Sequence, residues 1–209
     1  MPLSASAIPP PPLENEPVAA ARESAETLAL MARRRSTKVA HFVEPGPNGE
    51  EIDALIRVAA RVPDHGKLGP WRFVVIEGHA RARAGEAVAS AIAGDAGVDE
   101  TRLTAARNHF RRAPAVIMVV STAAPHPKIP EWEQQLSSGA VCFALLVASH
   151  ALGYAGAWLT EWPAYDARAR AALGLAEHER IAGFVYLGTA REPPTERVRA
   201  DAIARITRF

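Results

Sequence analysis

The sequence predicts a domain of the α+β (mixed α/β) class. Short apolar runs rich in β-branched and aromatic residues, bounded by glycine or proline, recur between segments with helical periodicity. One run, residues 114–121, is apolar almost throughout, as expected for a strand in the middle of a sheet. The longest helical pattern, residues 132–153, becomes apolar on every side, so it needs packing partners all round and is expected to line a subunit contact.

The other elements follow from local signals. A first helix is expected over residues 20–34, where an apolar stripe ends in three arginines. Asn48 and Glu51 have the spacing of a capping box, which predicts a second helix that begins there. The remaining predicted elements are strands at residues 71–77, 154–159 and 181–187, helices at 79–93 and 99–111, and a helix that stops near Gly174.

The two ends of the chain differ in composition from the middle. Residues 1–20 are rich in proline and poor in bulky apolar side chains, so they are predicted to form a flexible N-terminal extension. Residues 21–209 are predicted to form a single domain. Its last part, residues 192–209, begins with an extended Glu-Pro-Pro segment and is expected to cross a surface, of this chain or of a partner subunit.

Composition excludes several classes of function. A net charge of +1 provides no strong field toward nucleic acid or an anionic membrane. No run of 18 apolar residues and no secretory signal pattern occurs, so we expect a cytoplasmic protein with neither nucleic acid nor membrane as a partner. The only cysteine, Cys142, lies in an apolar segment and is interpreted as a packed hydrophobe rather than a reactive thiol.

The most distinctive loop of the chain precedes the predicted strand at residues 71–77. Pro63 and Gly66 bracket the polar pair Asp64 and His65. A polar loop that is held between two breaks and anchored on a buried strand is a common way to present a binding group. An ordinary helix-to-strand connection is the alternative, and spacing alone leaves both open.

A basic segment, Arg33-Arg34-Arg35, closes the first predicted helix, and Ser36 follows it. Cations complement the dipole at a helix C-terminus, so the segment is interpretable as a charged cap. The alternative is a phosphate site, because guanidinium groups bind phosphate oxygens in pairs and a serine adds a neutral donor.

Motifs for metal, nucleotide or nucleophile chemistry are absent from the sequence. No cysteine or histidine pair has zinc spacing, and neither a GxxxxGK[ST] loop, a GxGxxG after a strand nor a Gly-x-Ser-x-Gly elbow occurs. We therefore predict no metal site and no catalytic side chain, and a bound cofactor that carries the chemistry.

Four short motifs occur in order along the chain: Arg34-Arg35-Ser36, then Arg61-x-Pro63-x-His65 with Pro70-Trp71-x-Phe73, then Gly153-Tyr-Ala-Gly-Ala-Trp158, then Tyr186-Leu187-Gly188-Thr189. Together they resemble the FMN-dependent nitroreductase family, in particular its compact NAD(P)H nitroreductase subgroup. The resemblance implies a mainly antiparallel central sheet flanked by helices. It also implies an interlocked homodimer with FMN at the subunit interface.

The resemblance also implies a cofactor site. Arg34, Arg35 and Ser36 are expected to hold the FMN phosphate and ribityl chain, and Arg61 and His65 to contact the flavin across the interface. For His65, a role in capping the loop with Asp64 is the alternative. The full set of implied FMN contacts is Arg34, Arg35, Ser36, Lys38, Arg61, His65, Trp158, Leu159, Thr160 and Arg191.

A neighbouring stretch is implied to contact NADH or NADPH: Ala148, Ser149, His150, Ala151, Leu152 and Gly153. By its position alone, His150 is a helix-end cation or a satisfied polar group.

The implied function is that of an FMN-dependent oxidoreductase. It transfers hydride from NAD(P)H via the flavin to a nitroaromatic, quinone or similar acceptor, with ping-pong kinetics. The loop has Pro63-Asp64-His65 where many members of the family have a Pro-Ser pair. Residues that shape the substrate pocket elsewhere in the family are absent and a proline-rich head is present, so the alternative is a non-catalytic flavin-binding sensor or carrier with the same fold.

Overall fold

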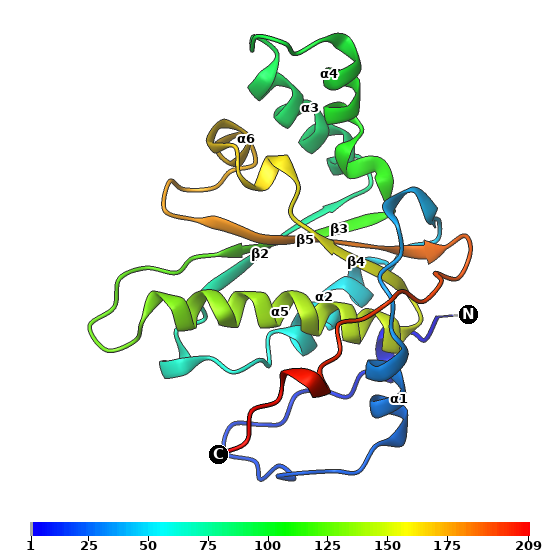
Figure 1. The fold of residues 1–209 in the computed structure, drawn as a ribbon, viewed down its shortest axis with the longest axis vertical. Helices are drawn as coiled ribbons and strands as arrows, with labels where there is room; N and C mark the ends of the chain where they lie inside the picture. The colour runs from blue at the N-terminus through cyan, green and yellow to red at the C-terminus, as the bar shows by residue number, and fades with distance from the viewer. Residues whose placement is uncertain (1) are drawn as a thin grey trace.

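A computed structural model describes residues 2–209 and shows a five-stranded sheet with helices on both faces (Figure 1). The strand order is β1-β5-β3-β2, and β4 also pairs with β5. Every pairing in this sheet is antiparallel. The predicted α+β class with a mainly antiparallel sheet is therefore confirmed. The strands are β1 (Phe42–Val43), β2 (Trp71–Glu77), β3 (Ala115–Ser121), β4 (Ala155–Leu159) and β5 (Arg180–Ala190).

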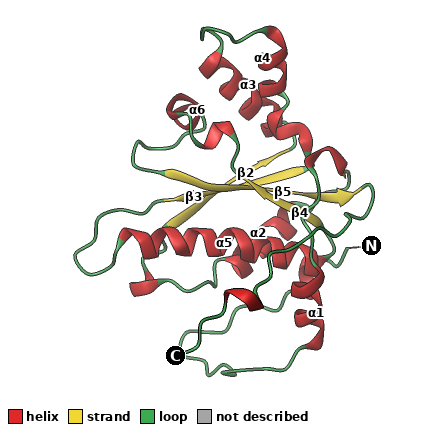
Figure 2. Ribbon diagram, in the orientation of Figure 1, coloured by secondary structure: helices red, strands yellow, loops and turns green. Residues whose placement is uncertain are grey.

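Helices cover the two faces of the sheet in separate groups (Figure 2). The helices α2 and α5 lie on one face, and α3, α4 and α6 on the other. The predicted capping box is present, because Asn48 and Glu51 each accept a hydrogen bond from the other's backbone N–H. The helices are α1 (Ala25–Arg33), α2 (Gly49–Ala59), α3 (Ala80–Ile92), α4 (Glu100–Arg107), α5 (Glu131–Leu152) and α6 (Ala167–Ala172).

Two predicted helices differ in their boundaries. The first begins at Ala25 rather than at residue 20, because the Ser24 side chain caps it by accepting from the Thr27 N–H. The pattern at residues 99–111 divides into α4 and a short 3-10 helix, η4 (His109–Arg112). The reason is that the chain must turn there to enter β3.

Two hydrophobic cores form, one on each face of the sheet. Phe110, Phe184 and Tyr186 are fully buried between the sheet and the α3, α4 and α6 side. Leu55 and Leu145 are fully buried between the sheet and the α2 and α5 side. Burying each such side chain contributes about 1.5–3 kcal/mol relative to leaving it in water. The strand β3 is buried on both faces, which confirms its predicted central position.

The helix α5 is buried on one side only within a single chain. Val141 and Cys142 are fully buried against the sheet. On the opposite side, Trp132, Leu136 and Phe143 are 66%, 53% and 40% exposed and form what we call the α5 stripe. By length and composition alone α5 is apolar enough to cross a membrane. Its packing on the sheet makes it the core helix of this domain.

Both ends of the chain touch the domain. The Leu3 N–H donates to the Leu152 carbonyl oxygen at 2.7 Å, and Ile8 packs against the core on the α2 and α5 face of the sheet. In the C-terminal segment, the Thr195 carbonyl oxygen accepts from the Arg35 Nε at 3.1 Å. The division into an extension of residues 1–20 and a domain of residues 21–209 stays a prediction.

Candidate functional site

The arginine segment forms a loop between α1 and a 3-10 helix at Val39–His41. The Thr37 N–H donates to the Gly156 carbonyl oxygen at 3.1 Å, which ties the loop to β4. The His150 Nε2 lies 3.1 Å from the Arg35 carbonyl oxygen, which ties the loop to the end of α5. The loop backbone is therefore fixed from two sides.

Arg34 carries an unusual side chain. Its Nη1 is buried and has no hydrogen-bond partner among residues 2–209. The guanidinium carbon lies 5.8 Å from the centre of the Phe143 ring on α5. A buried donor without an acceptor costs about 1–3 kcal/mol, more when charged. Arg34 also lines a cavity of about 350 Å³, beside Arg33 and Arg35.

A second cavity of about 210 Å³ borders the same loop. Arg35, Ser36 and Lys38 line it together with residues 192–195 of the C-terminal segment. Guanidinium, ammonium and hydroxyl groups in one loop form a donor set that suits a phosphate group. The donors around the two cavities therefore fit the phosphate end of a nucleotide cofactor such as FMN.

The backbone of Arg191 lies close to this loop. Its backbone N–H donates to the His41 carbonyl oxygen at 2.8 Å, at the point where β5 ends. Its side chain is exposed. The structure thus brings the end of β5 to the arginine loop, although the two are far apart in sequence.

Trp158 on β4 lies further along the same surface. Its indole Nε1 donates to the Ala182 carbonyl oxygen at 3.0 Å, and 38% of the residue is exposed. The ring lies over Gly183, where an added Cβ would stand 2.0 Å from the indole nitrogen. The same ring reaches to 3.8 Å from a Cβ built on Gly139 of α5. Only a glycine at 183 therefore leaves room for the indole.

One face of α5 links the arginine loop to Trp158. Gly139 faces Trp158 and Phe143 faces Arg34. Four residues separate these two positions, about 6 Å along a helix. Three of the predicted FMN contacts, Arg34, Arg35 and Trp158, therefore lie along one continuous stretch of surface.

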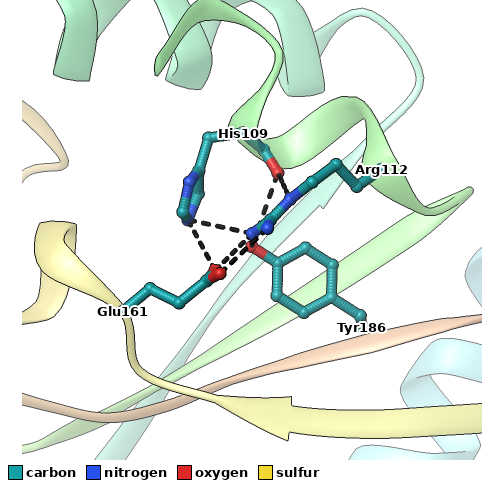
Figure 3. A network of polar contacts seen from close by, with 4 residues as sticks. All are labelled: His109, Arg112, Glu161 and Tyr186. Atoms are coloured by element: carbon teal, nitrogen blue, oxygen red, sulfur yellow. Dashed lines mark hydrogen bonds and ion pairs between the residues drawn. The ribbon is translucent and has the colours of Figure 1, made fainter. Parts of the chain in front are cut away.

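The chain leaves the sheet after Leu159, the last residue of β4. The Leu159 side chain packs against the core of the α3 face. The Thr160 hydroxyl accepts a hydrogen bond from the Tyr165 hydroxyl at 2.9 Å. The next residue, Glu161, has a φ of 55°, which is rare for a residue with a Cβ. Its carboxylate joins a network with His109, Arg112 and Tyr186 (Figure 3).

The loop at Pro63 is anchored by its own side chains and by α5. The Asp64 carboxylate accepts from the backbone N–H groups of Leu68 and Gly69 at 3.1 and 2.8 Å. The Ser137 hydroxyl of α5 donates to the Pro63 carbonyl oxygen at 2.8 Å. Asp64 thus caps the loop without help from His65.

His65 contacts α5 instead. Its Nδ1 lies 2.7 Å from the Glu133 carboxylate, and both side chains border a cavity of about 300 Å³ beside Leu136 and Ala140. Glu133 and Phe143 are ten positions apart, about 15 Å along the helix. His65 and the arginine loop therefore lie near different ends of the exposed side of α5.

Arg61 and Lys38 are exposed, and within residues 2–209 neither forms a salt bridge. Arg61 lies just beyond the end of α2, where its N–H donates to the Val58 carbonyl oxygen. The structure leaves both cations available and assigns neither to a ligand.

In the stretch predicted to contact NADH or NADPH, the polar side chains of Ser149 and His150 already have hydrogen-bond partners within the chain. The Ser149 hydroxyl donates to the Leu146 carbonyl oxygen, and His150 contacts the same oxygen at 2.6 Å through Nδ1. The contacts of His150 match the alternative interpretation as a satisfied polar group. Gly153 has a φ of 101° and ends α5. The stretch also includes Ala148, Ala151 and Leu152. Its contact with a nicotinamide nucleotide stays a prediction.

Sequence reasoning missed four residues that the structure places beside the predicted contacts. Phe143 and Glu133 lie on α5, and Arg112 and Gly183 contact the neighbourhood of β4. No local pattern marks them, because each meets its partner across a long sequence separation.

The fold and the site define a class of protein: an α+β domain with an antiparallel sheet and an arginine-lined cavity beside its longest helix. Residues 2–209 hold no cluster of metal-ligating side chains. The sequence profile of the Nitroreductase family matches residues 31–189. The chain is 40% identical over 168 residues to the "Putative NAD(P)H nitroreductase YdjA" of Escherichia coli (strain K12), a match that covers 78% of this chain and 88% of that protein. The chain belongs to the nitroreductase family.

Solved structures show the same fold. A nitroreductase-like family protein from Bacillus cereus matches with a TM-score of 0.77 and 19% identity, over 91% of this chain and 99% of that one. A nitroreductase with bound FMN from Bacteroides fragilis matches with a TM-score of 0.64 and 20% identity, over 89% of this chain and 100% of that one. The predicted fold is therefore that of the family.

Proposed function

We propose that this chain is a cytoplasmic, homodimeric, FMN-dependent oxidoreductase. The proposed reaction oxidises NADH or NADPH and reduces a nitroaromatic, a quinone or a similar small acceptor. Family membership supports it, as does the name of the Escherichia coli relative, "Putative NAD(P)H nitroreductase YdjA". The Bacteroides fragilis structure with bound FMN supports the choice of cofactor. When bound, FMN supplies the redox centre that accepts hydride from one substrate and returns electrons to the other.

The unpartnered Nη1 of Arg34 is the observation that carries the proposal. Buried polar groups in folded proteins are almost always hydrogen-bonded, so this donor calls for an acceptor that residues 2–209 do not supply. A phosphate supplies several acceptor oxygens and the opposite charge. In the proposal, Arg34, Arg35 and Ser36 hold the FMN phosphate and Lys38 approaches the pyrimidine edge of the ring.

In the proposal, another set of side chains orients and shields the ring of FMN. Trp158 offers an exposed indole face, and its hydrogen bond to the Ala182 carbonyl oxygen fixes the ring orientation. His65 holds Glu133 through Nδ1, which leaves Nε2 as the nitrogen free to contact a ligand. Arg61 and Arg191 are exposed cations with no competing salt bridge among residues 2–209, which suits a role in binding an anionic ligand.

The α5 stripe supports the proposed homodimer. A row of large apolar side chains is exposed to water on this helix: Trp132, Leu136 and Phe143. Burying them against a partner subunit would remove the free-energy cost of that exposure. The same side of α5 carries the contacts to Arg34 and Trp158. A second copy seated on the stripe would therefore also enclose the proposed cofactor site.

Spectroscopy of the purified full-length protein tests the function. We expect a flavin absorbance spectrum after loading with FMN, and rapid bleaching when NADH or NADPH is mixed in a stopped-flow instrument. Turnover with a nitroaromatic or quinone should give parallel lines in double-reciprocal plots, because the two substrates use one site in turn. Loaded protein that neither nicotinamide bleaches supports the non-catalytic flavin-binding alternative. A protein that stays colourless in excess FMN contradicts the proposal.

A further inference from the structure

A network of four polar side chains surrounds Glu161 in the loop after β4, and the proposed function does not use it (Figure 3). His109 and Arg112 come from η4, Tyr186 from β5, and Glu161 from the loop after β4. The Arg112 guanidinium donates through Nη1 to the Glu161 carboxylate at 2.9 Å and through Nη2 to its second oxygen. It also donates to the Tyr186 hydroxyl and to the His109 carbonyl oxygen, at 2.7 Å each. One guanidinium thus ties three segments of the chain together.

The network is largely shielded from water. The side chains of His109, Arg112 and Glu161 are 6%, 27% and 35% exposed, and Tyr186 is fully buried. Two-point pairing of a guanidinium with a carboxylate fixes both distance and orientation, which an ammonium cannot do. The pair is therefore a geometric clamp on Glu161 as well as an electrostatic contact.

The charges within the network balance. Burial, and next the charge of Arg112, lower the pKa of His109 to about 4, so its ring is neutral at neutral pH. The hydrogen bond from Arg112 lowers the pKa of Glu161, so that carboxyl is ionised. One cation and one anion remain. The intact network therefore adds no net charge to the neighbouring surface, and its influence there is through position.

Glu161 occupies a backbone conformation that needs such a clamp. Its φ of 55° lies in the left-handed region, where a residue with a Cβ is strained. It begins the turn in which the Ala164 N–H donates to the Glu161 carbonyl oxygen at 3.3 Å and the Tyr165 N–H to the Trp162 carbonyl oxygen at 3.0 Å. The residue just before it, Thr160, belongs to the predicted flavin contacts. The strained residue, Glu161, therefore lies where the chain passes from β4 into this turn.

We propose that Arg112 is a positioning residue that acts through Glu161 to fix the end of β4, Trp158 to Thr160, against the ring of the bound cofactor. This inference rests on the proposed function for the identity of the ligand. It assigns the orientation of the ring to the Arg112–Glu161 clamp and the retention of the phosphate to the arginine loop. The two roles are physically separate, because Arg112 lies on the α3 face of the sheet and Arg34 beside α5.

The test uses the full-length chain in four forms: wild type, Arg112→Met, Arg112→Lys and the control Arg107→Met. Arg107 of α4 makes exposed pairs with Glu100 and Glu86, at 2.5 and 3.3 Å, neither of which belongs to the turn after β4. Arg112→Lys keeps the positive charge without the fork. It also serves as the second variant if Arg112→Met fails to fold.

The first readout needs no cofactor. Hydrogen exchange of the amides at residues 159–166 should accelerate by about tenfold or more in Arg112→Met, because the turn opens locally when its clamp is lost. Exchange in β3 should stay unchanged, as should exchange at residues 159–166 in Arg107→Met. Arg112→Lys should recover only part of the protection. Exchange at 159–166 equal to wild type in both Arg112 variants overturns the inference.

The second readout uses protein loaded with FMN. Arg112→Met should alter the visible circular dichroism of the flavin and lower kcat for NADPH oxidation by about tenfold, the effect of losing one positioning contact. The FMN dissociation constant should change by less than about threefold, since the phosphate contacts remain. A loss of FMN affinity without a spectral or kcat change overturns the inference. Wild-type protein that ignores FMN refutes the proposed function instead, and the exchange readout still decides whether Arg112 positions the end of β4.

Discussion

Replacing Arg34 with methionine should separate cofactor binding from folding. Hydrogen bonds to charged groups contribute about 1.5–3 kcal/mol each. Since each 1.4 kcal/mol is a factor of ten, loss of one such bond to phosphate should weaken FMN binding by about 10- to 150-fold. Methionine retains most of the length of the side chain, so the packing beside Phe143 is largely kept.

Stability without FMN should respond differently to the same change. In the free protein the Arg34 Nη1 is a buried donor without a partner, and its removal relieves about 1–3 kcal/mol of unfavourable free energy. The cation–π attraction to the Phe143 ring, which methionine cannot make, is worth about 0.5–1 kcal/mol. Arg34→Met should therefore leave the free energy of unfolding unchanged or slightly raised.

Two titrations measure both quantities. FMN fluorescence quenching on apoprotein gives the dissociation constant, and urea unfolding without FMN gives the stability. Arg57→Met, on the exposed side of α2, is the matched control and should change neither. The reasoning is refuted if Arg34→Met binds FMN as tightly as wild type. It is also refuted if the variant loses more than about 2 kcal/mol of stability in the absence of FMN, which would make Arg34 a structural residue.

Three further changes test the packing and the electrostatics. Gly183→Ala puts a Cβ 2.0 Å from the Trp158 indole nitrogen, so urea unfolding should show a loss of about 1–3 kcal/mol together with altered tryptophan fluorescence. The Arg72 guanidinium lowers the pKa of the Glu179 carboxyl to about 2, below its unfolded value. Their pair therefore stabilises the fold fully above about pH 4.5 and loses its effect as the pH falls toward 2, so Arg72→Met should cost about 2–3 kcal/mol at pH 7 and progressively less in acid. Burial raises the pKa of the Cys142 thiol to about 12, so a thiol reagent at pH 8 should react only after unfolding.

Local signals predicted the elements well. The capping box at Asn48 and Glu51 fixed the start of α2, and the apolar run at residues 114–121 identified the central strand. The start of the first helix was misplaced, because alanine-rich sequence before Ser24 carries helix propensity without a core to pack on. The mainly antiparallel pairing came from the family resemblance, and the order of the strands was not predicted, since pairing between distant segments leaves no periodic trace.

The candidate site could be predicted only in part. Arg34 and Trp158 stand in motifs, so resemblance found them, and α5 brings them onto one surface. Other side chains near the site are held by residues that no local sequence pattern marks. Glu133 fixes His65 from 68 positions away, and Arg112 holds Glu161 from 49 positions away. Such contacts depend on the tertiary fold rather than on spacing along the chain.

The central claim is that two copies of this chain enclose FMN between them along α5. Light scattering combined with an FMN titration of the purified full-length protein tests it most directly. The account predicts a dimer that binds one FMN per chain with absorbance features of an enclosed flavin. A monomer that leaves the spectrum of added FMN unchanged would contradict it.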